Sequence, residues 1–164
     1  MSFEATKNLT GARQLVKLIE WELGTIDEYA SSGFNSIGGG RGSGYSDRIS
    51  KALIRKDKIV RTLTSALNAC LCIEEASQQE LASVENLELR SLIIYRYVHN
   101  KAWQDIAQEF DNDVTADAIK KRFERGLKAY ENTQPHVPYS PNALKAIAWI
   151  KEAQSIANEE KIAG

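Results

Sequence analysis

Positively charged side chains gather in one segment of nine residues. These residues are Lys120, Lys121, Arg122, Arg125 and Lys128. The only acidic residue among them is Glu124. Such side chains contact the phosphates of a nucleic acid, which gives affinity and register without choice of sequence. Three residues just before the cluster, Thr115, Ala116 and Asp117, could reach base edges in the major groove. Lys120 or Lys121 could reach base edges with them. The chemistry that suits this segment is recognition of double-stranded DNA.

No other residues have the types and spacing that catalysis or metal binding needs. Cys70 and Cys72 are the only cysteines, and side chains two apart on a helix point in different directions. His99 and His136 are the only histidines, and they complete no ligand set. No Ser/His/Asp, Cys/His or paired-carboxylate group has supportable spacing. We therefore expect no enzymatic activity and no cofactor.

Two helices are expected before the cationic segment, over residues 87–98 and 102–110. Asn86 is a good N-cap for the first, and Asn100 can end it because Asn tolerates the left-handed conformation of a sharp stop. The second carries its apolar residues at positions i, i+3, i+4 and i+7 of one face, and these are Trp103, Ile106, Ala107 and Phe110. Ala107 is small, where a crossing helix must come close.

A third helix is expected after a polar turn at 111–114. Thr115 can cap it, and Asp117 suits the positive end of its dipole. Its core-facing residues are four apart, and they are Ile119, Phe123 and Leu127. A short helix, a polar turn and a basic third helix favour a helix-turn-helix. The alternative is an amphipathic helix with a solvated basic face in an all-helical bundle.

These residues resemble region four of bacterial sigma factors. That pattern has an Arg-Tyr helix end, a Trp-x-x-Ile-Ala helix and a recognition helix with a Val-Lys-x-Arg core. The matching residues are Arg96-Tyr97, Trp103-Gln104-Asp105-Ile106-Ala107 and Ile119-Lys120-Lys121-Arg122-Phe123. The turn departs from the pattern, because residues 111–114 read Asp-Asn-Asp-Val where a Gly is usual.

Over roughly residues 10–131 the layout resembles phage transcriptional activators of the ArpU/RinA kind. A first helix, a Gly/Ser loop and Tyr-Ser-Asp opening a long basic helix precede the sigma-like segment. The resemblance implies a phage or prophage regulator that binds promoter DNA and switches on late, packaging or morphogenesis genes. It places Thr115, Ala116, Asp117 and Lys120 at the groove, and Lys121, Arg122 and Arg125 at the backbone.

The predicted fold class is all-α, with a helical hairpin or oligomerisation region at 1–84. The DNA-binding helix-turn-helix occupies 85–132, and a linker and C-terminal helix occupy 133–164. In that last helix Ser140 is the expected N-cap and Pro141 the first helical residue. Its apolar stripe, which serves core or dimer packing or else a partner, is Leu144, Ile147, Ala148 and Ile150.

Within the hairpin region the first helix is expected over 10–31, with Thr10 as N-cap and Gly33 as stop. The Gly-rich loop at 33–44 reads as a linker or mobile loop. A phosphate cradle is disfavoured because no strand precedes it and no Gly-Lys-Ser/Thr occurs.

A long helix without Gly or Pro is expected from Tyr45. Its apolar residues step by four and three in a seam interrupted by one charge, namely Ile49, Leu53, Lys56, Val60, Leu63, Leu67 and Cys70. The partner of this seam is either the first helix, folded back, or the same helix in a second subunit. Residues 45–61 carry six basic residues against two acids, which favours a solvated face over contact with DNA phosphates.

The 164 residues have a formal net charge of −1 and a pI of about 6.2, so contact with a nucleic acid must come from local charge. No apolar run approaches ~18 residues, so no membrane span is expected. The two cysteines fit a reducing cytoplasm, here that of a bacterial host.

The leading hypothesis is a sequence-specific regulator of transcription that acts as a homodimer. One recognition helix on a near-neutral protein reads DNA weakly, and two-fold pairing adds contacts. A second hypothesis is a phage small terminase subunit, which would form a ring for DNA packaging. A third is an adaptor whose sigma-like segment contacts host RNA polymerase or a sigma factor.

Overall fold

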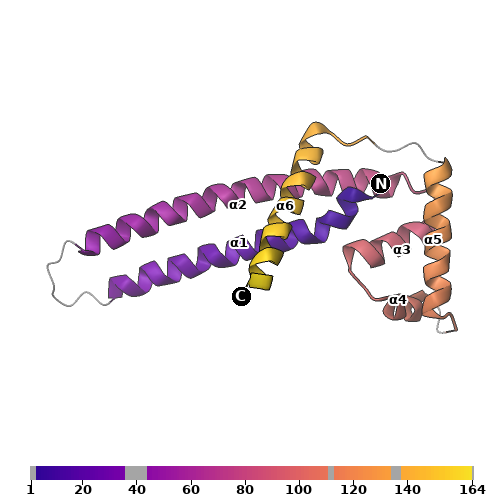
Figure 1. The fold of residues 1–164 in the computed structure, drawn as a ribbon, viewed down its shortest axis with the longest axis horizontal. Helices are drawn as coiled ribbons and strands as arrows, with labels where there is room; N and C mark the ends of the chain where they lie inside the picture. The colour runs from indigo at the N-terminus through magenta and orange to yellow at the C-terminus, as the bar shows by residue number, and fades with distance from the viewer. Residues whose placement is uncertain (1–2, 36–43, 111–112, 134–137, 164) are drawn as a thin grey trace. The chain divides into compact units, whose positions relative to one another are not determined.

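The computed structural model describes residues 3–35, 44–110, 113–133 and 138–163, and within these ranges it contains helices and no strand. The predicted all-α fold class is therefore confirmed. In chain order the elements are α1 (Glu4–Asn35), α2 (Gly44–Ala82), α3 (Leu87–Ile93), the π-helical turn η1 (Ile94–Val98), α4 (Trp103–Phe110), α5 (Ala116–Thr133) and α6 (Pro141–Ala163) (Figure 1).

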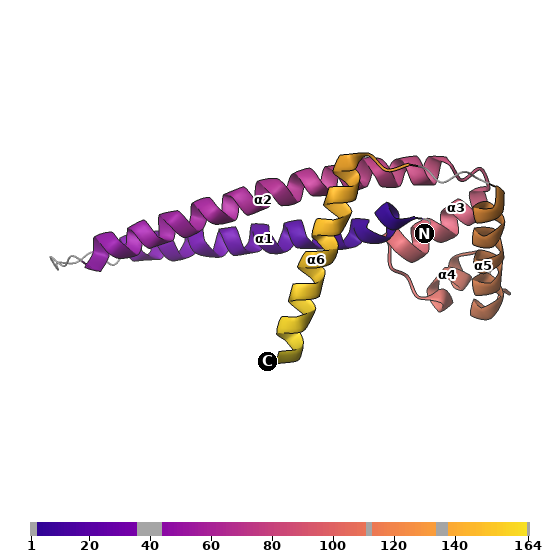
Figure 2. The same cartoon turned by 45° about the horizontal axis from the view of Figure 1, so that its top comes forward.

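These elements divide into two compact units whose bounds differ from the ranges expected from the sequence. Residues 13–68 make up the hairpin unit, in which α1 and α2 run side by side in both views (Figure 1 and Figure 2). Residues 1–12 and 69–164 make up the core unit. The core unit thus holds α3, η1, α4 and α5, which are the helices of the expected DNA-binding segment. It also holds the first turns of α1, the last turns of α2 and the whole of α6.

An apolar seam and two exposed ion pairs join the helices of the hairpin unit. Val16 and Ile19 are buried on α1, and Ala66 is buried on α2. The nitrogen–oxygen distances of the ion pairs are 3.3 Å for Arg55–Glu22 and 2.5 Å for Lys56–Asp27. Exposed pairs of this kind contribute about 0–1 kcal/mol each, so the buried seam supplies most of the pairing energy.

The seam predicted on α2 is partly wrong. Leu53, Val60 and Leu67 are 62%, 40% and 42% exposed, and the side chain of Ile49 lies outside the described residues. Lys56 and Leu63 are turned inward as predicted, and the other inward positions are the residues just before the exposed ones, namely Ala52, Ile59 and Ala66. Alanine at two of these positions presents a small side chain to α1.

The predicted ends of the first helix are also wrong. Because α1 runs from Glu4 to Asn35, Thr10 and Gly33 both lie inside it. Thr10 does not cap the helix; its hydroxyl donates to the carbonyl oxygens of Val98 at 2.9 Å and Tyr97 at 3.2 Å. Most of the predicted loop, residues 36–43, lies outside the described residues.

Three predicted N-caps are confirmed in the core unit. The Asn86 side-chain oxygen accepts from Leu89 N at 3.0 Å, Thr115 Oγ1 accepts from Ala118 N at 3.3 Å, and Ser140 Oγ accepts from Ala143 N at 3.1 Å. Asn100, expected to end the helix before α4, has a positive φ of 51°. These four features need only residues within one turn of each other, which is why the sequence reveals them.

The hydrophobic core around α3, α4 and α5 includes a residue from the start of the chain. Phe3 is 2% exposed, has a φ of 62°, and its ring centroid lies 5.2 Å from that of Tyr130. The other buried members are Val84, Leu89, Leu92, Ile93, Ile106, Ala107, Ile119 and Phe123. The segment 85–132 therefore shares its core with Phe3 and with Val84.

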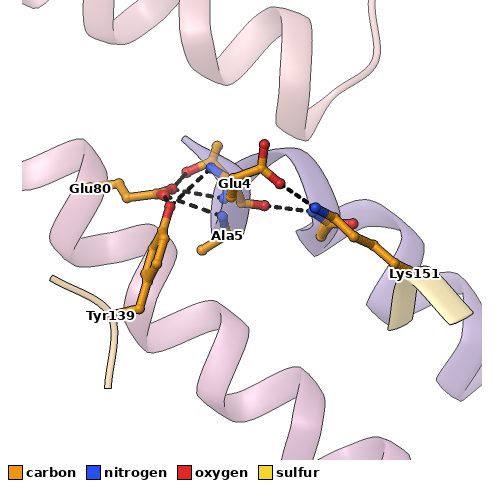
Figure 3. Close-up of polar contacts among 7 residues, drawn as sticks. Glu4, Ala5, Glu80, Tyr139 and Lys151 are labelled. Carbon is orange, nitrogen blue, oxygen red and sulfur yellow. Dashed lines mark hydrogen bonds and ion pairs between the residues drawn. The ribbon is translucent and has the colours of Figure 1, made fainter. Parts of the chain in front are cut away.

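A buried carboxylate caps the first turn of α1. Glu80 of α2 is 3% exposed, and it accepts hydrogen bonds from Ala5 N at 3.2 Å, Thr6 N at 2.8 Å and Thr6 Oγ1 at 2.6 Å (Figure 3). The Tyr139 hydroxyl also donates to Glu80 and accepts from Glu4 N at 3.1 Å. Three distant parts of the chain meet at this carboxylate.

The predicted stripe of α6 is partly wrong. Ile147 and Ile150 are buried, but Leu144 is 54% exposed and Ala148 is exposed. The buried face is Ala143, Ala146, Ile147 and Ile150. The α6 helix lies beside the first turns of α1, where the flexible end of Gln154 occupies the space next to Gly11.

Replacing Glu80 with alanine should destabilise the core unit. The backbone N–H groups of Ala5 and Thr6 would lose their buried acceptor, which costs on the order of 1–3 kcal/mol for each unsatisfied group. Urea unfolding followed by circular dichroism measures the change. Glu75→Ala, an exposed glutamate on the same helix, is the matched control and should change stability by less than about 0.5 kcal/mol. Equal midpoints for the two variants would contradict the role of Glu80.

Alkaline pH should weaken the same contact. Burial and the hydrogen bond to Glu80 raise the pKa of the Tyr139 hydroxyl above its ordinary value of 10.0. The pKa of the Tyr139 hydroxyl is higher in the folded state than in the unfolded state. Its contribution to stability is therefore fully present below about pH 10 and is lost as pH rises through the folded-state pKa. The free energy of unfolding should therefore fall above about pH 10, and it should fall less in Tyr139→Phe. A parallel decline in both proteins would count against the assignment.

Candidate nucleic-acid interface

The helices α4 and α5 share a buried apolar contact. Ile106 and Ala107 of α4 and Ile119 and Phe123 of α5 are all at most 5% exposed. The Phe123 ring lies 5.1 Å from the Trp103 ring and 5.8 Å from the Tyr97 ring, measured between centroids. Aromatic pairs at these distances add about 0.5–1.5 kcal/mol each beyond burial. Phe123 thus fixes the orientation of α5 against both preceding helices.

A close crossing of α3 and α5 further restrains the interface helix. Gly126 of α5 faces Leu89 of α3, and a Cβ at Gly126 would lie only 2.9 Å from Leu89 Cδ1. Real Cβ atoms essentially never come that close to another atom. Glycine at position 126 therefore lets α3 and α5 lie closer together than a residue with a Cβ would. The crossing therefore sets which face of α5 turns outward.

The end of the helix before α4 is wider than expected. Residues 94–98 form a π-helical turn, with His99 N donating to Ile94 O at 3.0 Å. Arg96, within this turn, donates to Lys101 O at 2.9 Å and stacks 5.2 Å from the Trp103 ring centroid. Arg96 therefore holds the start of α4. Its place in the sigma-like pattern was visible in the sequence, but this contact was not.

The predicted DNA-contacting residues all lie on the cap or body of α5. All of them except the half-buried Ala116 are exposed, and they are Thr115, Ala116, Asp117, Lys120, Lys121, Arg122, Arg125 and Lys128. Asp117, Lys121, Glu124 and Lys128 share one stripe because they follow at spacings of four, three and four. This outward stripe lies opposite the buried Ile119 and Phe123, and it contains acids as well as cations.

Acidic partners accompany three of the five cations. Nitrogen–oxygen distances are 3.9 Å for Lys121–Asp117, 4.0 Å for Lys120–Glu124 and 3.6 Å for Arg122–Glu88. The first two are exposed pairs within α5, worth about 0.2–0.5 kcal/mol each, so their lysines can exchange the partner for a phosphate at little cost. The third joins α5 to α3, and sequence reasoning missed it because it depends on how these helices cross.

Arg122 and Arg125 do not lie on the outward stripe with Lys121 and Lys128. They line a cleft of about 290 Å³ between α3 and α5, whose other walls are Asn86, Glu88, Leu89, Leu92 and Gly126. Arg125 Nε also donates to Lys121 O at 3.3 Å. The predicted site is therefore divided into an outward cationic stripe and an arginine-lined cleft.

The turn before α5 is only partly described. Asp111 and Asn112, where the sequence departs from the sigma-like pattern, lie outside the described residues. Val114 packs against the core cluster.

No group of three or more His, Cys, Asp or Glu side chains in the described ranges could hold a metal ion. Cys70 and Cys72 are half-buried and form no disulfide. Of the helices in the part of the chain that the structure describes, none is long and apolar enough to span a lipid bilayer.

In comparisons with known proteins, no family, no curated protein and no solved structure matches this chain.

Replacing Gly126 with valine should push α3 away from α5. The added side chain would meet the buried Leu89, and overpacking of this kind costs about 1–3 kcal/mol. Gly24→Val is the matched control, because nothing lies within 4 Å of a Cβ built at Gly24. Thermal unfolding should show a lower midpoint for Gly126→Val and an unchanged or slightly higher one for Gly24→Val. A loss of the same size in both variants would mean that the crossing is not close.

Proposed function

We propose that this chain is a sequence-specific DNA-binding protein that regulates transcription of phage or prophage late genes in the cytoplasm of a bacterial host. The observation that carries the proposal is the packed α3–α4–α5 unit. Ile119 and Phe123 fix α5 in that unit, while Lys121 and Lys128 face outward. The resemblance to sigma-factor region four and to ArpU/RinA activators supports a regulatory role.

In this proposal α5 is the recognition helix. Its 18 residues span roughly 27 Å, and its first turn enters the major groove. Exposed residues there suit particular base edges: Asp117 can accept from the amino group of cytosine, Lys120 can donate to guanine, and Thr115 can contact the methyl group of thymine. Each good contact discriminates against a wrong base by about 1–3 kcal/mol.

Phosphate contacts supply most of the affinity. Lys121 and Lys128 lie on the outward stripe, with Lys120 beside them. Because the formal net charge of the chain is −1, long-range attraction to DNA is weak and these local cations must supply it. Binding should therefore be strongest at low salt.

The active form in this proposal is a homodimer on promoter DNA. A single recognition module buries about 600–1,000 Å² of protein surface, at the low end for specific complexes. Two copies related by a two-fold axis read two half-sites and double the contacts. The sigma-like segment also implies contact with host RNA polymerase, for which the cleft at Arg122 and Arg125 offers a surface apart from the outward stripe.

Removing two outward lysines should weaken DNA binding by an amount that can be calculated from the number of phosphates they neutralise. If Lys121 and Lys128 each neutralise one phosphate, the combined substitution to alanine lowers the slope of log affinity against log salt by about 1.8, and it lowers affinity roughly 60-fold at 0.1 M salt. The measurement is fluorescence anisotropy at several salt concentrations, with DNA fragments selected from the genome around the chain's own gene.

Two further variants separate affinity from specificity. Lys145→Ala removes an exposed lysine from α6 and should bind as the unaltered protein does. Asp117→Ala should change the preferred base at one position and leave the salt slope unchanged, because it removes a base contact and no phosphate contact. The proposal fails if folded protein selects no fragment at low salt, or if Lys121→Ala/Lys128→Ala and Lys145→Ala have the same affinity.

A further inference from the structure

Large apolar side chains remain exposed along one side of α2 in the hairpin unit. Leu53 is 62% exposed, Ile54 69%, Val60 40% and Leu67 42%. Leu53, Val60 and Leu67 are seven residues apart, so each lies only about 20° around the helix from the one before. They form one stripe, which we call the α2 stripe; Ile54 lies about 100° to one side of it.

The hairpin leaves this stripe uncovered. Positions that α2 turns inward lie one residue earlier, at Ala52, Ile59 and Ala66, and are rotated about 100° from the stripe. Lys56 and Leu63 are turned inward as well, while Leu53, Val60 and Leu67 remain exposed. A helix with one paired seam and a second apolar seam beside it is suited to pack against two helices at once.

We propose that the α2 stripe is where a second copy of this chain binds, with the two α2 helices antiparallel about a two-fold axis near Val60. The inference rests on the homodimer of the proposed function and locates its interface. An axis at Val60 places Leu53 of each copy against Leu67 of the other, since the two are equally far from it in sequence. A self-complementary patch of this kind is what a two-fold interface requires.

Charges beside the α2 stripe favour the antiparallel arrangement. Asp57 and Arg61 lie on the side of the stripe toward Ile54, 63% and 80% exposed, and their side chains pair at 2.9 Å. With the axis at Val60, Arg61 of one copy and Asp57 of the other are offset by two residues, roughly 3 Å along the helix. Each arginine can then reach the aspartate of the other copy, twice by symmetry. A parallel pair in register would set like charges opposite each other, which is unfavourable.

The size of the stripe predicts the strength of the dimer. From Leu53 to Leu67 the helix rises roughly 21 Å, and three apolar side chains per copy form a smaller contact than the ~1,200–2,000 Å² of a standard interface. We therefore expect dissociation in the micromolar range, with monomer and dimer both present at accessible concentrations.

Sedimentation equilibrium of the full chain without DNA, from about 1 to 100 µM, tests the interface. The unaltered chain should show a monomer–dimer equilibrium. Val60→Asp places two like charges at the axis and should give monomer throughout, with unchanged helical circular dichroism. Trp21→Asp is the matched control, because Trp21 is 72% exposed in the same unit but lies on α1, and it should leave the equilibrium unchanged.

Charge reversal tests the direction of pairing. Asp57→Arg and Arg61→Asp should each weaken the dimer about tenfold or more, and the double variant should restore it, because the opposite charges again face each other across the axis. The placement of the interface is wrong if Val60→Asp still dimerises, if Trp21→Asp is the variant that dissociates, or if the unaltered chain is monomeric or forms a ring. Sedimentation measures association without DNA, so it tests the interface independently of DNA binding. Binding of Val60→Asp to a single half-site would show separately that α5 recognises DNA.

Discussion

The carboxylate of Glu80 is the contact on which the arrangement of the core unit depends. A buried carboxylate without hydrogen-bond donors costs several kcal/mol, so its surroundings must supply them. Here the donors are Ala5 N, Thr6 N, the Thr6 hydroxyl and the Tyr139 hydroxyl. Two of these are backbone groups of the first turn of α1, which every helix leaves without partners. Glu80 thus accepts hydrogen bonds from the N–H groups at the start of α1. In return, the positive end of the α1 dipole stabilises the negative charge of Glu80.

That cap extends its effect to the candidate interface through Phe3. Because α1 begins at Glu4 next to Glu80, Phe3 is held at the helix entrance, with a φ of 62° that a bulky residue adopts only under constraint from its surroundings. Its ring packs on Tyr130 of α5 in the same core that holds Ile119 and Phe123. The orientation of the cationic helix therefore rests on packing from the N-terminal residues as well as on α3 and α4. A fragment limited to 85–132 would lack that contact.

Features that need only one turn of chain could be predicted from the sequence, and features that need two helices to meet could not. Asn86, Thr115 and Ser140 cap their helices because a side-chain oxygen reaches an amide three residues ahead. Thr10 looked like another such cap, but α1 begins earlier because Glu80, far away in sequence, supplies its cap. Likewise the basic character of α5 was visible, while its division into an outward stripe and a cleft was not. That division depends on Gly126 and Leu89, where α3 and α5 cross.

The error in the predicted α2 seam has a physical meaning of its own. Hydrophobic periodicity marked Leu53, Val60 and Leu67 as the buried positions, because burying large side chains contributes the most. The hairpin instead turns Ala52, Ile59 and Ala66 inward and leaves Leu53, Val60 and Leu67 exposed. A chain that acts alone gains nothing from that choice, since exposed leucines favour association without adding to the packed seam. The choice is favourable when both seams are used, one for the small-residue contact with α1 and the other for contact with a second subunit. In the proposed dimer, the two partners that the sequence offered as alternatives for one seam would both bind α2, on adjacent faces of the same helix.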